Sequence, residues 1–176
     1  IATLGGKVDL FAKVGNDPFG THLIETMKDF GVCTDFIFKD VSTFTTLAFV
    51  SLMENGERDF YFNRGADAFL NVTDLDAIQL NNYDIIHFGS ATAFLSGQLQ
   101  ETYLELLRKA IATRKFICFD PNYRDLLFRN NKEKFIHQSW HFMKYANFMK
   151  VSEEEALMLT QTSKIEEACN ILQNSI

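Results

Sequence analysis

The sequence has few cysteines, no strongly basic run and no long apolar run. Cys33, Cys118 and Cys169 are odd in number, far apart and free of any CxxC pair. This pattern favours reduced thiols in a cytoplasmic protein over a disulfide framework or a zinc site. No window approaches the roughly 18 uninterrupted apolar residues of a membrane span. The formal charge is −6, and without a basic run it argues against a surface that wraps nucleic acid.

The composition is that of a folded domain. Of the 176 residues, 47% are hydrophobic and 18 are Phe, which predicts a well-filled core rather than disorder. The length suits one sizeable domain or part of a larger one. The chain opens without Met, and its last helical pattern, from Ile165, is followed by no C-cap or further element. We therefore expect these residues to be a fragment.

Strand and helix patterns alternate along the chain. A strand over Val8–Val14 is followed by a turn and by a helix over Phe19–Phe30. In that turn Asp17 is typical of a helix N-cap, and Pro18 of a first helical residue. We expect strands over Thr45–Met53 and Asp59–Phe62, and the turn signal Asn55-Gly56 between them predicts an antiparallel hairpin.

The middle of the chain repeats a strand followed by a helix. We expect strands over 83–88, 116–119 and 148–151, and helices over 97–113, 132–145 and 152–160. This order predicts an α/β fold with a parallel sheet covered by helices, to which the hairpin is added as a flap. In such sheets, ligands bind in the crevice beyond the carboxyl ends of the strands.

Polar residues follow the three strands at that crevice. They are "HFGSA" from His87, "DPNYR" from Asp120 and "KVSEEE" from Lys150. From the residues alone, "DPNYR" is either a ligand-binding loop or a proline turn with a local salt bridge. The S-x-x-E pattern of Ser152 and Glu155 indicates a helix capping box, and less strongly a carboxylate that holds magnesium through water.

Two nucleotide-binding fingerprints are missing. No G-x-G-x-x-G follows a strand, which disfavours a Rossmann dehydrogenase, and no G-x-x-x-x-G-K-[ST] occurs. His137 and His141 are four residues apart without the glutamate of an HExxH zinc motif, so an exposed helix face is the better interpretation. His87, at a strand end, remains a weak candidate for a catalytic base.

The ordered motifs resemble those of the PfkB (ribokinase-like) carbohydrate kinases, with the fructokinase branch closest. They are "LGGKVDLFAKVGNDPFG", "TTLAFVSLMENGERDFYFNRGADAFL", "IIHFGS", "FDPNYRDLLF" and "KVSEEEALMLT". The resemblance implies a ribokinase-like three-layer α/β/α fold, with a mainly parallel central sheet and a small β-lid hairpin at about residues 42–65. It also implies transfer of the γ-phosphoryl group of ATP to a sugar hydroxyl, with fructose as the expected acceptor and ATP and Mg²⁺ as cofactors.

The resemblance assigns the sugar side of the site to four residues. Arg64 matches a lid-side position that often contacts the sugar. Asp120, Asn122 and Arg124 match the family's "DPN-x-R" segment, whose arginine can face the substrate.

The cofactor side is implied by the family's N-x-x-E motif for magnesium and phosphate. Ser152 and Glu155 fall on this motif, with Glu155 expected to meet Mg²⁺ through water. Ser replaces Asn at the first position, so Glu155 carries over better than Ser152.

The resemblance also implies that parts of the family's domain are not in this sequence. A first strand with a sugar-binding Asp would precede Ile1, and the "GAGD" segment with the catalytic base would follow Ile176. We therefore expect residues 1–176 to be one incomplete kinase domain without the C-terminal ATP-binding part or a catalytic residue. Alone they should be inactive, whereas the intact protein should be a kinase.

Other interpretations stay open. The acceptor is alternatively 2-keto-3-deoxygluconate or another sugar, and the protein is alternatively a non-catalytic sugar-binding protein on the same scaffold. We expect a homodimer formed through the lid, and neither nucleic acid nor a membrane as a partner.

Overall fold

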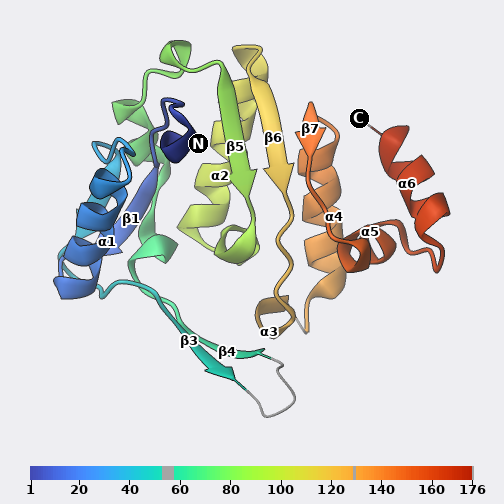
Figure 1. Ribbon diagram of the computed structural model, residues 1–176, viewed down its shortest axis with the longest axis horizontal. Coiled ribbons are helices and arrows are strands. Elements are labelled where there is room, and N and C mark those ends of the chain that lie inside the picture. The colour runs from blue at the N-terminus through green and yellow to red at the C-terminus, as the bar shows by residue number, and fades with distance from the viewer. Residues whose placement is uncertain (53–57, 129, 176) are drawn as a thin grey trace. The chain divides into compact units, whose positions relative to one another are not determined.

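The computed structural model describes residues 1–52, 58–128 and 130–175 (Figure 1). The chain divides into two compact units. The first contains Ile1–Ile78 and Gly97–Thr102, and the second contains Gln79–Ser96 and Tyr103–Ile176. Among the described residues, no helix is both long and apolar enough to cross a membrane.

The first unit begins with a parallel strand pair joined by a helix. β1 (Ala12–Gly15) pairs with β2 (Ile37–Asp40), and α1 (Pro18–Asp29) lies between them in the sequence. The predicted start of this helix is confirmed, because Asp17 is its N-cap and Pro18 its first residue. β2 was not predicted, because a strand of four residues is too short to show a clear alternation of apolar and polar residues.

An antiparallel hairpin follows in the same unit. β3 (Leu47–Leu52) pairs with β4 (Arg58–Asn63), with Leu47 opposite Asn63. The predicted hairpin is therefore confirmed, and both strands fall within the expected lid range of about 42–65. The predicted turn at Asn55-Gly56 lies outside the described residues.

The carboxylate of Asp17 ties the start of the hairpin to the turn between β1 and α1. Its Oδ1 accepts hydrogen bonds from the N–H of Gly20 and from the Thr45 hydroxyl, both at 2.8 Å, and its Oδ2 accepts from the Thr45 N–H at 2.7 Å. The bonds from the backbone N–H groups of Gly20 and Thr45 lower the pKa of Asp17. Gly15 is needed here because a Cβ on it would lie 2.4 Å from the Thr45 nitrogen.

Short 3-10 turns complete the first unit. These are η1 (Ala2–Leu4), η2 (Ala66–Phe69) and η3 (Val72–Ala77). The ammonium group of Lys13, on β1, holds the last two in place: it lies 2.6 Å from the Asp74 carboxylate and donates to the Phe69 carbonyl at 3.0 Å.

The second unit contains a three-stranded parallel sheet. Its strands β5 (Ile85–Gly89), β6 (Phe116–Asp120) and β7 (Phe148–Met149) lie side by side in this order. The helices are α2 (Gln98–Ala112), which begins in the first unit, α3 (Asp125–Phe128), α4 (Lys132–Met143), α5 (Glu153–Thr160) and α6 (Ile165–Gln173), with the turns η4 (Leu80–Asn82) and η5 (Ala91–Phe94) before α2. The parallel pairing of β5 with β6 and of β6 with β7 confirms the predicted parallel arrangement.

An aromatic cluster fills the core of the second unit. The ring of Phe142, on α4, lies 5.3 Å from that of Phe88, 5.2 Å from Phe94 and 5.5 Å from Phe119, and all four are buried. Such ring pairs contribute about 0.5–1.5 kcal/mol each beyond the area they bury. Phe88 on β5 and Phe119 on β6 are opposite each other in the sheet, so the cluster packs α4 against one face of it.

Removing the Thr45 hydroxyl should destabilise the protein. Thr45 is buried, and its hydroxyl oxygen accepts from the Gly15 N–H at 2.9 Å while its proton goes to Asp17. Thr45→Val leaves that buried N–H without an acceptor, so we expect the free energy of unfolding to fall by about 1–3 kcal/mol in urea denaturation. Thr45→Ser keeps the hydroxyl and should lose less. An equal loss in both variants would attribute the effect to packing instead.

Candidate functional site

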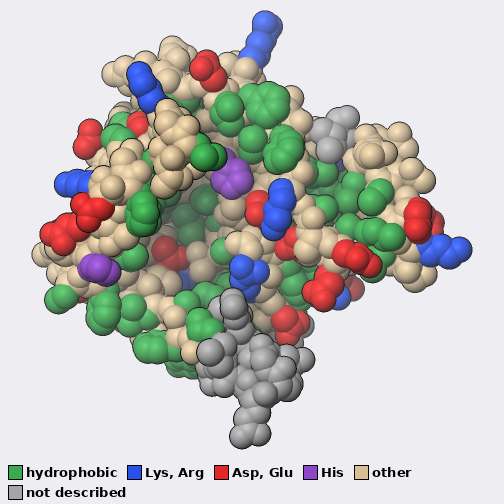
Figure 2. Space-filling view, in the orientation of Figure 1, with side chains coloured by type: hydrophobic (Ala, Val, Ile, Leu, Met, Phe, Trp, Pro, Cys, Tyr) green, Lys and Arg blue, Asp and Glu red, His purple; other side chains and the backbone are tan. Residues whose placement is uncertain are grey.

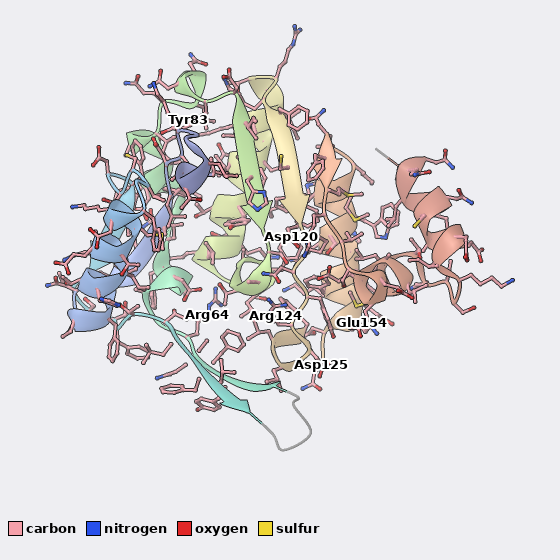
Figure 3. All side chains as sticks on the ribbon, in the orientation of Figure 1. Arg64, Tyr83, Asp120, Arg124, Asp125 and Glu154 are labelled. Atoms are coloured by element: carbon pink, nitrogen blue, oxygen red, sulfur yellow. The ribbon has the colours of Figure 1, made fainter. Side chains whose placement is uncertain are left out.

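Residues 121–124 form a loop between the end of β6, at Asp120, and the start of α3, at Asp125 (Figure 3). The carbonyl groups of Asp120 and Pro121 are both bound by Ser90, which is buried and directly follows β5. The Ser90 N–H donates to the Asp120 carbonyl at 3.1 Å, and the Ser90 hydroxyl donates to the carbonyl of Pro121. Ser90 therefore links two of the three segments predicted to form the crevice.

Asp120 and Asn122 shape the loop. The Asp120 Oδ1 accepts from the Asn122 N–H at 3.2 Å, and its Oδ2 lies 3.5 Å from the ammonium of Lys150. The Lys150 side chain is 64% exposed, so this ion pair contributes little to stability. Asn122 has a φ of 47°, a left-handed conformation that Asn tolerates better than most residues.

Tyr123 is held at three points. Its N–H donates to the Oε1 of Glu155 at 2.7 Å, and its carbonyl accepts from the Nη1 of Arg124 at 2.9 Å. Its ring packs at 4.9 Å from that of Phe135 and 6.2 Å from that of Phe128. The backbone before Arg124 is thereby attached to both the core and α5.

The predicted capping box at the start of α5 is confirmed. The Ser152 hydroxyl accepts from the Glu155 N–H at 3.2 Å, and the Oε2 of Glu155 accepts from the Ser152 N–H at 2.8 Å. The same S-x-x-E spacing at Ser163 and Glu166 forms no such box, because α6 has Lys164 as N-cap without a side-chain cap bond. The two motifs have the same S-x-x-E spacing, but only the first has its Ser at the N-cap of a helix.

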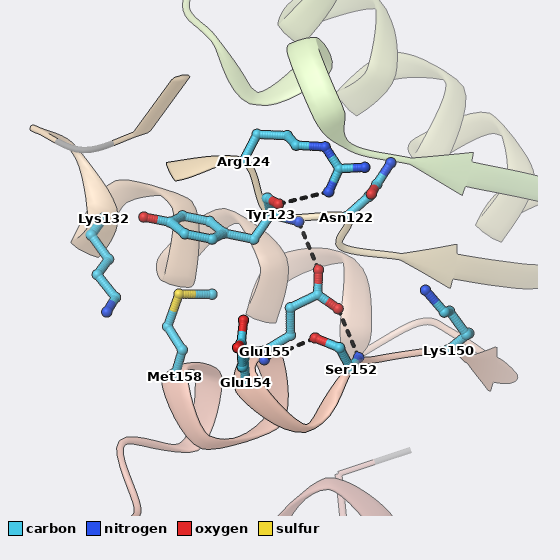
Figure 4. A pocket seen from close by; sticks show the side chains of 9 residues that line it. All are labelled: Asn122, Tyr123, Arg124, Lys132, Lys150, Ser152, Glu154, Glu155 and Met158. Carbon is cyan, nitrogen blue, oxygen red and sulfur yellow. Dashed lines mark hydrogen bonds between the residues drawn. The ribbon is translucent and has the colours of Figure 1, made fainter. Parts of the chain in front are cut away.

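A pocket of about 420 Å³ opens between the loop and α5 (Figure 4). It is lined by Asn122, Tyr123, Arg124, Lys132, Lys150, Ser152, Glu154, Glu155 and Met158. Three of these residues are cations and two are carboxylates, and one of the carboxylates already accepts two N–H groups. The three cations suit a polar ligand that carries negative charge, such as a phosphate group.

The structure brings most of the predicted site residues together. Asn122, Arg124, Ser152 and Glu155 all line the pocket, and Asp120 builds its loop without lining it. Arg64 belongs to the first unit, where it directly follows β4 and its Nε lies 3.4 Å from the carboxylate of Asp67.

Three contributors were not predicted individually. Ser90 was part of a quoted crevice segment, but its burial and two bonds follow only from the pairing of β5 with β6. Lys132 lines the pocket because α4 begins there beside the loop, and Met158 does so because α5 passes the same loop. No local sequence signal marks either residue. His87 is exposed on β5 and does not line the pocket.

The described residues do not fit a directly coordinated metal ion. No group of three or more His, Cys, Asp or Glu side chains among them is placed to hold one. Both carboxylate oxygens of Glu155 accept backbone N–H groups. Contact between Glu155 and Mg²⁺ through water, which the family resemblance implies, stays a prediction.

Comparison with known proteins agrees with this geometry. A family model described as "pfkB family carbohydrate kinase" matches residues 1–176. A fructokinase of Vibrio alginolyticus is 33% identical over 169 residues, which are 94% of this chain and 53% of that protein. The chain spans about half the length of the curated relatives it matches.

Two solved structures have the same fold. A sugar kinase from Pyrococcus horikoshii in complex with ATP has a TM-score of 0.81 and 32% identity, over 91% of this chain and 52% of that one. A fructokinase from Vibrio cholerae, in a form with fructose, ADP and calcium bound, has a TM-score of 0.83 and 26% identity, over 98% of this chain and 56% of that one.

Substitutions at Asn122 should separate its backbone role from its side chain. Asn122→Gly removes the amide but suits the positive φ, so the free energy of unfolding should stay within about 0.5 kcal/mol of the original. Asn122→Val forces a β-branched residue into the same conformation and should cost about 1–2 kcal/mol. Urea denaturation measures both values. If glycine were as destabilising as valine, the backbone explanation would be wrong.

Proposed function

Because the chain belongs to the pfkB family of carbohydrate kinases, we propose that the protein transfers the γ-phosphoryl group of ATP to a hydroxyl of fructose. The observation that carries this proposal is the pocket beyond the carboxyl end of β6, where cations lie beside a loop whose backbone is held by the carboxylate of Glu155. The similarity to the two fructokinases supports fructose as the acceptor. Phosphoryl transfer depends mainly on positioning of the two substrates and on stabilisation of the negative charge on the phosphoryl group, and the residues of the pocket are suited to both.

On the sugar side, Arg124 is the residue that binds. Its Nη1 is occupied by the Tyr123 carbonyl, and a guanidinium carries five N–H donors, so others remain for sugar hydroxyls. Asp120 and Asn122 keep the loop in the conformation from which Arg124 projects. Arg64 is proposed to contact the sugar from the lid hairpin, with Asp67 orienting its side chain.

On the cofactor side, the phosphates of ATP are proposed to meet the cations of the pocket. Lys132 and Lys150 line it together with Ser152 at the start of α5, and the positive end of a helix dipole favours negative charge at that point. Mg²⁺ is proposed to accompany ATP and to reach Glu155 only through water. We assign no catalytic base among residues 1–176, and we propose that these residues contribute one part of a kinase domain.

A sugar acid is the second candidate acceptor. Guanidinium groups bind carboxylates with two parallel hydrogen bonds, and two of the proposed sugar ligands are arginines. 2-Keto-3-deoxygluconate therefore belongs beside fructose in a substrate panel with ATP and Mg²⁺. A protein that binds these sugars without phosphorylating them would be the non-catalytic alternative. We propose a cytoplasmic location on the basis of the three free cysteines.

Arg64→Ala and Arg124→Ala should each raise the KM for fructose about tenfold or more in the intact protein, because each removes a charged hydrogen-bond donor. Arg108→Ala is the matched control, since Arg108 on α2 is 68% exposed and pairs only with Glu105 among the described residues. Steady-state kinetics with ATP and Mg²⁺ measure these values. Kinetics unchanged in both site variants would remove the two arginines from the sugar site.

Phosphorylation of fructose by residues 1–176 alone would contradict the expectation that they are inactive.

The protein is also proposed to form a homodimer through the hairpin. Phe49 and Tyr61 are 56% and 70% exposed and lie opposite each other across β3 and β4, with their rings tilted by 45°. These strands form a sheet of only two, so each has an edge that no other described strand covers. Hydrophobic side chains also reach the surface elsewhere (Figure 2), so exposure alone does not identify an interface.

Charged substitutions on the hairpin should therefore dissociate the dimer. Phe49→Lys and Tyr61→Lys place a charge in the proposed interface, and sedimentation equilibrium should then give the mass of one chain. Phe30→Lys, at a comparably exposed aromatic next to α1, should leave the dimer intact. A dimer that persists in both hairpin variants would place the interface elsewhere.

A further inference from the structure

The carboxylate of Glu155 joins two segments that are distant in the sequence. One oxygen accepts from the Ser152 N–H, three residues earlier, and the other accepts from the Tyr123 N–H, 32 residues earlier. The side chain is buried, with 7% of the residue exposed. A capping box uses only the first of these bonds, so the second gives Glu155 a role that the helix cap does not explain.

The second bond ends at the residue before Arg124. The Tyr123 N–H is held by Glu155, and the Tyr123 carbonyl accepts from the guanidinium of Arg124. The ring of Tyr123 is packed against two phenylalanines, so the residue has little freedom to rotate between the two bonds. The direction in which Arg124 projects therefore depends on the bond to Glu155.

This arrangement needs a carboxylate. Each oxygen of an ionised Glu accepts hydrogen bonds, whereas the amide of Gln has one oxygen that accepts and one nitrogen that only donates. Gln at this position would keep at most one of the two bonds and would turn an N–H group toward the other donor. Bonds to an ionised acceptor are also about twice as strong as neutral ones.

We propose that Glu155 is a positioning residue for Arg124, which it aims by holding the backbone N–H of Tyr123. The beginning of α5, on the proposed phosphate side, is in this way connected to the proposed sugar side. The effect on sugar binding rests on the proposed kinase function, whereas the hold on the Tyr123 N–H does not.

Two neighbours provide matched controls. Glu154 lines the same pocket and is exposed, so Glu154→Gln makes the same change of charge without touching either N–H bond. Ser152→Ala removes the hydroxyl of the capping box but leaves the Ser152 N–H and the carboxylate of Glu155 in place. The first control separates the hold on Tyr123 from the charge of the pocket, and the second separates it from helix capping.

Hydrogen exchange of the Tyr123 amide, followed by NMR relative to core amides of β6, tests the proposal. The amide should be protected in the original protein and should exchange at least tenfold faster in Glu155→Gln, since its bond to an ionised acceptor is either lost or replaced by a weaker bond to a neutral amide oxygen. It should stay protected in Glu154→Gln and Ser152→Ala. If Glu155→Gln does not fold, Glu155→Asp, which keeps the charge on a shorter side chain, should show the same selective loss. An unprotected Tyr123 amide in the original protein, or equal protection in the Glu155 variant, would overturn the proposal.

Kinetics provide a second readout in the intact protein. Glu155→Gln should raise the KM for the sugar about as much as Arg124→Ala does, and the double variant should be little worse than either single one, because both changes remove the same contact. If the effects of the two substitutions on KM were fully additive while the Tyr123 amide had lost its protection in Glu155→Gln, then Glu155 would hold the loop without aiming Arg124. Absence of kinase activity in the original protein would contradict the proposed function and leave the exchange result as it stands.

Discussion

Where the chain leaves a buried strand, its backbone N–H and C=O groups must find new hydrogen-bond partners, and this constraint shapes the site. Residues 121–124, which follow β6, form neither a helix nor a strand, so their N–H and C=O groups need partners outside a helix or a sheet ladder. Ser90 supplies the donors for the carbonyls of Asp120 and Pro121, the Asp120 carboxylate accepts from the Asn122 N–H, and Glu155 accepts from the Tyr123 N–H. The ends of β5 and β6 and the start of α5 are thereby connected through one short loop. The pocket lies between this loop and α5.

The first unit uses a similar device. Asp17 caps α1 and also accepts from the N–H and the hydroxyl of Thr45, 28 residues later. Glu155 likewise completes the cap of α5 and accepts from a distant N–H. In both cases a carboxylate at the beginning of a helix satisfies groups of that helix and attaches a distant segment to it: the hairpin in one unit and the Arg124 loop in the other.

Much of this structure could be predicted from the sequence, because it depends on local pattern. The alternation of strands and helices, the hairpin and the cap at Asp17 all follow from residue spacing and turn chemistry. What could not be predicted depends on tertiary contacts. The spacing of Ser152 and Glu155 is the same as that of Ser163 and Glu166, and only the first pair forms a capping box. The second bond of Glu155 and the burial of Ser90 require the parallel pairing of the sheet.

We propose that the loop after β6 presents Arg124 to a sugar. A crystal structure of the intact protein with fructose bound tests this claim most directly. We expect a sugar hydroxyl within hydrogen-bonding distance of the Arg124 guanidinium, with the Tyr123 N–H still bonded to the carboxylate of Glu155. Fructose bound away from this loop, with Arg124 turned to solvent, would contradict it.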